Sequence, residues 1–263
     1  MNYGKMEEEF RHLFSPIAIG SIGVKNRIVM APLGTGFARG GFATETFKNF
    51  YVARCKGGVG LIMVGGANHV VPPGNLTAIW NRHPGLYDDK FIPGWREVTE
   101  AVHEHDTKIG IQLFHWGRQT TCTSWGSQPV CSSPIPCPVS REVPRELTVD
   151  EIRKLVEFYA EAARRARDAE FDLVEIHAAH GYLGTNFLSP YMNKRTDSYG
   201  GDARGRARFI AEIIRRIKEK VGRNFTVGVR YNGADYIEGG ATLEDAEAVA
   251  PFLVDAGADY LSI

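Results

Sequence analysis

Residues 166–183 read ARDAEFDLVEIHAAHGYL. The segment begins as the end of an expected helix, passes through an apolar run typical of a buried strand, and finishes with two histidines and a tyrosine. The same order, a helix that ends in small residues followed by a short apolar strand, recurs in residues 53–64 (ARCKGGVGLIMV) and 253–263 (LVDAGADYLSI). Alternating helices and strands with short connections predict a parallel sheet covered by helices.

The pattern predicts six strands, each after the first preceded by a helix. They lie at roughly residues 27–32, 59–64, 108–113, 172–177, 225–230 and 259–263. Two helices carry a clear start signal, because Thr148 opens a capping box with Glu151 and Thr242 begins TLEDAEAVAPFL in the same way. Residues 117–147, rich in Ser, Pro and Cys, lack this pattern, and we expect a lid or binding loop there.

The two-residue period of a strand separates two faces of the sheet. In three successive strands one face is apolar and suits contact with helices, whereas the other face is largely polar or small. The second face carries Lys108, Gly110, Gln112, Leu173, Glu175, His177, Thr226, Gly228 and Arg230. Gln112, His177 and Arg230 fall at the carboxyl ends, where a (β/α)₈ barrel places its active site. We expect a ligand site, with Gly110 and Gly228 allowing a flat ligand to approach; a buried polar network that only fixes the barrel is the alternative.

Composition excludes several classes of partner. The 263 residues carry a formal net charge of zero, which argues against nucleic acid or an anionic membrane as a partner. No apolar run approaches roughly 18 residues, the length that spans a bilayer. The first residues, MNYGKMEEEFRHLF, lack the apolar core of a secretory signal, so we expect a cytoplasmic protein. The four cysteines (Cys55, Cys122, Cys131 and Cys137) form no C-x-x-C pair, and we expect reduced thiols and no metal site.

Four longer motifs carry a resemblance to a known family. They are LFSPIAIGSIGVKNRIVMAP (13–32), YVARCKGGVGLIMVGG (51–66), IQLFHWGR (111–118) and HAAHGYLGTNFLSPYMNKRTDSYGG (177–201). Over nearly its whole length the chain resembles the old yellow enzyme family of NADH:flavin oxidoreductases. VMAPLGTG (29–36) and IMVGG (62–66) are most similar to its branch of 2,4-dienoyl-CoA reductases and trimethylamine dehydrogenase.

The resemblance implies a (β/α)₈ TIM barrel with an N-terminal β-hairpin and an FMN at the top of the barrel. The residues expected at this cofactor are Ala31, Pro32, Leu33, Gly66, Gln112 and Arg230. Arg230 would stabilise the negative charge of the reduced flavin, and Gln112 offers a donor and an acceptor to its pyrimidine edge. NAD(P)H would reduce the flavin, and an α,β-unsaturated carbonyl compound or enoyl thioester would reoxidise it.

The resemblance also implies catalytic roles within HAAHGYL. Transfer of hydride from flavin N5 to an activated alkene builds negative charge on the carbonyl oxygen of the substrate. His177 and His180 would donate hydrogen bonds to that oxygen, and Tyr182 would supply the proton. The alternative is a capped turn with solvent-facing histidines. Arg195 and Asp197 are expected to form an ion pair that fixes their loop.

The last expected strand is the sixth of eight. We therefore expect residues 1–263 to form one FMN-binding barrel domain that is incomplete on its C-terminal side. A 4Fe-4S cluster and FAD would be possible only in a missing C-terminal part. We expect an ene-reductase that assembles as a homo-oligomer. Two alternatives stay open: a flavoprotein amine dehydrogenase of the same fold, and a catalytically inactive partial barrel that acts through a partner chain.

Overall fold

Six parallel strands form one curved sheet in the computed structural model, which describes residues 9–72 and 80–263. Their order across the sheet is β10-β9-β8-β5-β4-β3, so successive strands of this sheet are neighbours. The bounds are β3 (Val29–Met30), β4 (Leu61–His69), β5 (Lys108–Phe114), β8 (Leu173–Ala178), β9 (Thr226–Tyr231) and β10 (Tyr260–Ser262). All six expected strands are present. The second extends to His69, beyond its expected end, and its pairing with β5 shifts register between Val64 and Asn68.

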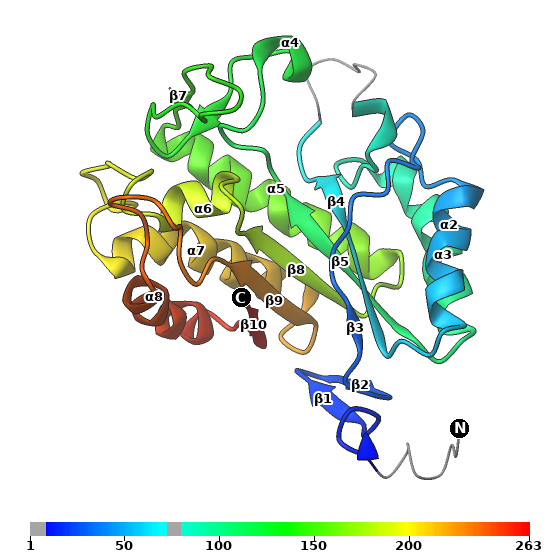
Figure 1. Cartoon of the computed structure of the whole chain (residues 1–263). Coiled ribbons are helices and arrows are strands. Elements are labelled where there is room, and N and C mark those ends of the chain that lie inside the picture. The colour runs from blue at the N-terminus through cyan, green and yellow to red at the C-terminus, as the bar shows by residue number, and fades with distance from the viewer. Residues whose placement is uncertain (1–8, 73–79) are drawn as a thin grey trace.

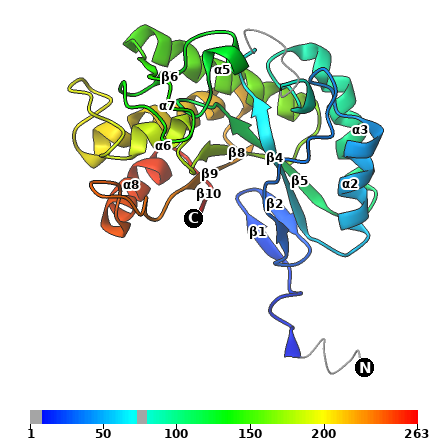
Figure 2. The same ribbon diagram turned by 45° about the horizontal axis from the view of Figure 1, so that its top comes forward.

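A helix precedes each strand after β3, as the sequence predicts. These helices are α2 (Glu45–Cys55), α3 (Ile92–His103), α5 (Val149–Asp168), α7 (Ala203–Val221) and α8 (Leu243–Asp255). Figures 1 and 2 show them around the outer face of the curved sheet. Both expected capping boxes are confirmed: Thr148 caps α5 together with Glu151, and Thr242 caps α8 together with Asp245. Among the described residues, no helix has the length and apolar character needed to cross a bilayer.

The outer face of the sheet is apolar, as the two-residue period predicts. Its side chains belong to one large core shared with the helices and include Ile109, Ile111, Leu113, Val174, Ile176, Val227 and Val229, all fully buried. The inner face carries a separate small cluster of Leu61, Met63 and Leu173 near the amino ends of the strands. Gln112, Glu175, His177 and Arg230 lie beyond this cluster, toward the carboxyl ends, whereas Lys108 and Thr226 are level with Leu61 and Leu173.

A short antiparallel pair of strands covers the amino end of the sheet. β1 (Ile17–Ile19) pairs with β2 (Ile22–Val24), and both lie below the parallel strands in Figures 1 and 2. Val24 is buried in the inner cluster, and Ile17, Ile19 and Ile22 pack against it. The main chain of Ser21 also donates a hydrogen bond to Thr226 Oγ1 at 3.2 Å. The pair thus covers the amino end of the inner face with apolar side chains.

The two inner glycines do not act as expected. A Cβ atom on Gly228 would lie 2.0 Å from Cζ of Tyr260, and one on Gly110 would lie 2.7 Å from the Leu173 side chain and 2.8 Å from Met63. Both glycines therefore make room for side chains of the protein itself. The expectation that they admit a flat ligand is wrong, because neighbouring strands fill the space.

The segment 117–147 lies at the carboxyl end of the sheet (Figure 1). It contains α4 (Cys122–Trp125), β6 (Val130–Cys131) and β7 (Arg145–Glu146), and β6 and β7 pair in parallel. We call this segment the lid segment. The four cysteines of the chain are free thiols.

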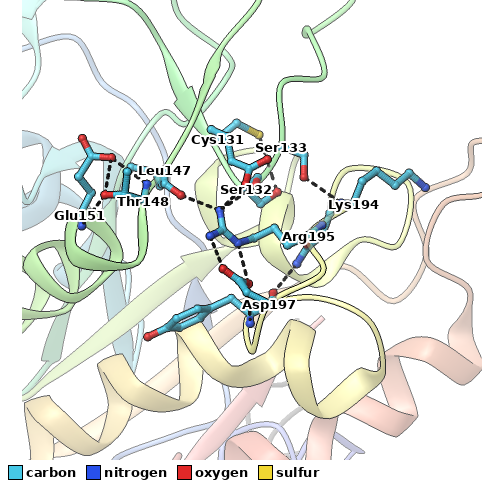
Figure 3. Close-up of polar contacts among 12 residues, drawn as sticks. Cys131, Ser132, Ser133, Leu147, Thr148, Glu151, Lys194, Arg195 and Asp197 are labelled. Carbon is cyan, nitrogen blue, oxygen red and sulfur yellow. Dashed lines mark hydrogen bonds and ion pairs between the residues drawn. The ribbon is translucent and has the colours of Figure 1, made fainter.

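Arg195 ties the lid segment to the loop before α7, as Figure 3 shows. Its guanidinium donates to the main-chain oxygens of Ser132 (3.2 Å) and Leu147 (2.7 Å). It also forms two parallel hydrogen bonds with the carboxylate of Asp197, at 3.0 and 2.5 Å. The expected ion pair of Arg195 and Asp197 is confirmed, and the same side chain joins two distant segments.

Candidate functional site

A cavity of about 280 Å³ opens at the carboxyl ends of the strands. It is lined by Pro32, Gly34, Gly66, His83, Gln112, Phe114, Trp116, His177, His180, Tyr182 and Arg230. The convergence of Gln112, His177 and Arg230 predicted from strand phase is confirmed. Ala31 and Leu33 lie outside this lining, and their expected contact with a cofactor stays a prediction.

The wall of the cavity near β3 depends on close contact between two main-chain segments. Gly66 has φ +83°, and a Cβ atom there would lie 2.0 Å from Cα of Gly34. Only glycine fits at position 66, because the added atom would overlap the main chain. The oxygen of Gly66 lies 2.9 Å from Nδ1 of His83. The contacts of Gly66 with Gly34 and His83 place these residues, together with Pro32, on one side of the cavity.

Aromatic side chains form a second wall. The ring of Tyr182 lies edge-on to Phe114 and Trp116, with centroid separations of 4.6 and 5.5 Å. Phe114 and Trp116 were not singled out from the sequence. Phe114 continues the inward alternation of Gln112 on β5, so the strand period would have found it. Trp116 lies two residues beyond the end of β5, where the same spacing carried past the strand would also have indicated it. His83 follows no comparable pattern.

His177 is buried at the carboxyl end of β8, with its ring 5.1 Å from those of both His180 and Tyr182. Burial lowers its pKa to about 3, and the nearby His180 and Arg230 act in the same direction. The imidazole is therefore neutral near pH 7. Its Nδ1 accepts a hydrogen bond from the main chain of Ala179 at 3.3 Å, which assigns the proton to Nε2. A neutral ring with this tautomer is a hydrogen-bond donor through Nε2.

His180 occupies the turn after β8 with φ +61°. Its main-chain N–H donates to Asn232 Oδ1 at 3.0 Å, and its oxygen accepts from Gln119 Nε2 at 2.6 Å. Burial and the charge of Arg230 lower its pKa. The turn is thus held from the lid segment and from the loop after β9. Both histidines line the cavity, but His177 is buried whereas His180 is exposed. The alternative of solvent-facing histidines is therefore wrong for His177 and stays open for His180.

Tyr182 completes this group of side chains. Burial raises the pKa of its phenol above the ordinary value near 10, so the hydroxyl keeps its proton at neutral pH. A protonated phenol beside two neutral imidazoles can donate a proton to a bound molecule.

Glu175 lies one layer deeper on the inner face and was given no role from the sequence. Its Oε1 accepts from Gln112 Nε2 at 2.8 Å, and its Oε2 accepts from the Tyr260 hydroxyl at 3.0 Å. Burial raises the pKa of this carboxyl group, whereas the hydrogen bonds and the charge of Arg230 lower it. Strand period places Glu175 inside, but its partners could not be read from the sequence.

The lining suits a flat, partly polar ring system. Gln112 offers amide hydrogen bonds, Arg230 offers a permanent positive charge, and the aromatic wall offers apolar contact. These residues could hold a flavin, and the charge of Arg230 would favour its negatively charged reduced form. Within the described residues, no group of three or more acidic, histidine or cysteine side chains is arranged to hold a metal ion.

Comparisons with known proteins identify the family of the chain. Residues 12–262 match the model of the NADH:flavin oxidoreductase / NADH oxidase family. The chain is 43% identical to NADH oxidase of Thermoanaerobacter brockii over 256 residues, which are 97% of this chain and 39% of that enzyme. The chain therefore spans well under half the length of this relative.

Solved structures show the same fold. The old yellow enzyme homologue of Zymomonas mobilis superposes with a TM-score of 0.84 at 34% identity, covering 95% of this chain and 72% of that one. A complex of 2-naphthoyl-CoA reductase with 2-naphthoyl-CoA gives 0.87 at 29% identity, covering 96% of this chain and 41% of that one. The family expected from the motifs is confirmed, whereas the branch within it stays a prediction.

Proposed function

Because the chain belongs to the NADH:flavin oxidoreductase / NADH oxidase family, we propose that it is the FMN-binding part of an ene-reductase. Such an enzyme uses NAD(P)H to reduce the C=C bond of α,β-unsaturated carbonyl compounds or enoyl thioesters. The observation that carries the proposal is the meeting of His177, His180 and Tyr182 with Gln112 and Arg230 in one cavity. The six strands are then successive strands of a (β/α)₈ barrel.

When bound, FMN supplies the hydride. The protein supplies the surroundings of the substrate. His177 donates from Nε2, and His180 donates beside it, so the carbonyl oxygen is held where its negative charge develops. Tyr182 keeps its proton at neutral pH and delivers it to the substrate carbon. Pro32, Gly66, Gln112 and Arg230 would hold the cofactor.

The substrate class follows from this arrangement of donors. Two neutral imidazoles favour an uncharged carbonyl oxygen, which both enones and thioesters present. The structural likeness to 2-naphthoyl-CoA reductase with 2-naphthoyl-CoA supports a thioester. The choice between NADH and NADPH and the expected homo-oligomer stay predictions.

The test is the replacement Tyr182→Phe in the FMN-loaded protein. Stopped-flow measurement of the two half-reactions should show unchanged flavin reduction by NAD(P)H and alkene reduction slowed by about 100-fold or more, because only the second step needs the phenolic proton. Tyr236→Phe is the control, because that side chain is 96% exposed. Equal losses in both half-reactions would assign Tyr182 a structural role, and a purified protein that takes up no flavin would contradict the proposal as a whole.

A further inference from the structure

Four neighbouring strands meet in one layer beneath the cavity, and three of them contribute polar side chains to it. Glu175 on β8 is level with Gln112 on β5 and with Gly228 on β9, and Gly228 is level with Tyr260 on β10. The glycine lets the Tyr260 ring cross to Glu175, because any side chain at 228 would occupy that space. Glu175 and Gln112 are each 3% exposed. The carboxyl group is thus fixed from both sides in a site that excludes bulk water.

The hydrogen bond from Gln112 to Glu175 determines the orientation of the amide. Nε2 of Gln112 lies 2.8 Å from Oε1 of Glu175. The opposite orientation would place the amide oxygen against a carboxylate oxygen, and two acceptors at that distance repel each other. The amide oxygen of Gln112 is therefore directed away from Glu175. Any ligand in the cavity meets an amide of known orientation.

The partners of Glu175 suit its charged form. Both of its oxygens accept hydrogen bonds, from Gln112 and from Tyr260, as a carboxylate can. Arg230 lies on the same face of β9, two residues beyond the position level with Glu175. Burial raises the pKa of Glu175, whereas the two hydrogen bonds and the charge of Arg230 favour the carboxylate. A buried carboxylate and a guanidinium in one site offset each other's charge.

We propose that Glu175 is a positioning residue of the flavin site, where its carboxylate orients the Gln112 amide and offsets part of the Arg230 charge. The inference rests on the proposed function, because it takes the ligand of the cavity to be FMN. A negative charge at this place disfavours the anionic reduced flavin. Glu175 therefore lowers the reduction potential of the bound cofactor and keeps it a stronger hydride donor.

The test is Glu175→Gln, which keeps the shape of the side chain and removes its charge. Its amide oxygen can still accept from Gln112, and the Tyr260 oxygen can accept from its NH₂ group. The midpoint potential of bound FMN, measured by spectroelectrochemistry, should shift to a more positive value. The melting temperature of the flavin-free protein should stay unchanged. Glu212→Gln is the matched control, since Glu212 accepts a hydrogen bond from Tyr199 at 2.8 Å and pairs with Arg208, and neither partner lines the cavity.

A second variant, Glu175→Asp, separates orientation from charge. It keeps the carboxylate but shortens the reach to Gln112, so the potential should stay near that of the unaltered protein while FMN binds about tenfold more weakly, which is about 1.4 kcal/mol. Fluorescence titration with FMN measures this. FMN-loaded Glu175→Gln with an unchanged potential, or Glu175→Asp with unchanged affinity, would overturn the inference while leaving the proposed function intact. Failure of the unaltered protein to bind FMN would overturn both.

Discussion

At position 228 the packing of the sheet interior requires glycine, because there is no room for a side chain. The ring of Tyr260 occupies the place where a Cβ atom would be, at 2.0 Å from its Cζ. Gly228→Ala should therefore lower the free energy of unfolding by about 1–3 kcal/mol, because the ring or the strand must move. Urea denaturation measures this. Gly23→Ala is the matched strand control, since nothing lies within 4 Å of its added Cβ; equal stability of the two variants would contradict the packing account.

Single residues also show where prediction from the sequence works. The period of two residues placed Gln112, His177 and Arg230 at one mouth, because strand geometry fixes the direction of alternate side chains. Glu175 was placed inside by the same rule. Its role was missed because Tyr260, some 85 residues later in the chain, reaches it through the gap at Gly228. A pairing of this kind is a property of the packed sheet, which no local pattern encodes.

At the scale of elements, the lid segment depends on one arginine. Arg195 is the donor to the main-chain oxygens of Ser132 and Leu147, and its side chain is only 4% exposed. Arg195→Lys keeps the charge but loses the planar fork that serves these oxygens and Asp197 together. The free energy of unfolding should fall by about 1–3 kcal/mol for a buried main-chain oxygen left without a donor.

Chemical denaturation and limited proteolysis check the Arg195→Lys prediction. Cleavage should become faster within residues 117–147, while sites elsewhere keep their rates. The control is Arg153→Lys, whose side chain is 69% exposed and pairs with Asp150 on the surface of α5. Unchanged cleavage of the lid segment would show that other contacts hold it.

Elements differ in how far they could be predicted. The helices with capping boxes and the apolar strands were expected in their places, because their signals lie within a few residues of the chain. The extension of β4 to His69 was missed, since it includes a register shift against β5 that the two-residue period does not indicate. The short parallel pair β6 and β7 was also missed, because strands of two residues leave no periodic signal.

The whole molecule should lose stability in mild acid. His69, His115 and His177 are buried, and burial holds the pKa of His69 well below its ordinary value, that of His115 at about 4 and that of His177 at about 3. Unfolded histidine has a pKa near 6.5, so the unfolded chain binds more protons below that pH. The three histidines therefore make their full contribution to the free energy of unfolding above about pH 6.5. Below that pH the free energy of unfolding falls, by up to about 1.4 kcal/mol per pH unit for each histidine.

Denaturation curves between pH 7.5 and 5 measure this slope. Glu175 acts in the opposite direction, since its raised pKa favours the folded state as the pH falls. His115→Asn should flatten the slope by one histidine, because the Asn oxygen can still accept from Gly117, which now donates to His115 Nδ1 at 3.0 Å. An unchanged slope in His115→Asn would contradict the assignment.

The backbone of His180 limits which substitutions this position can accept over evolutionary time. Its φ of +61° excludes β-branched residues and favours Gly, Asn, Asp and His. The proposed role also needs a hydrogen-bond donor, which Gly lacks and an ionised Asp cannot provide. Asn is the substitute that meets both conditions, and its codons differ from those of His by a single base. We therefore expect the exchange between His and Asn to be the single-base change at position 180 that keeps both the backbone conformation and the hydrogen-bond donor.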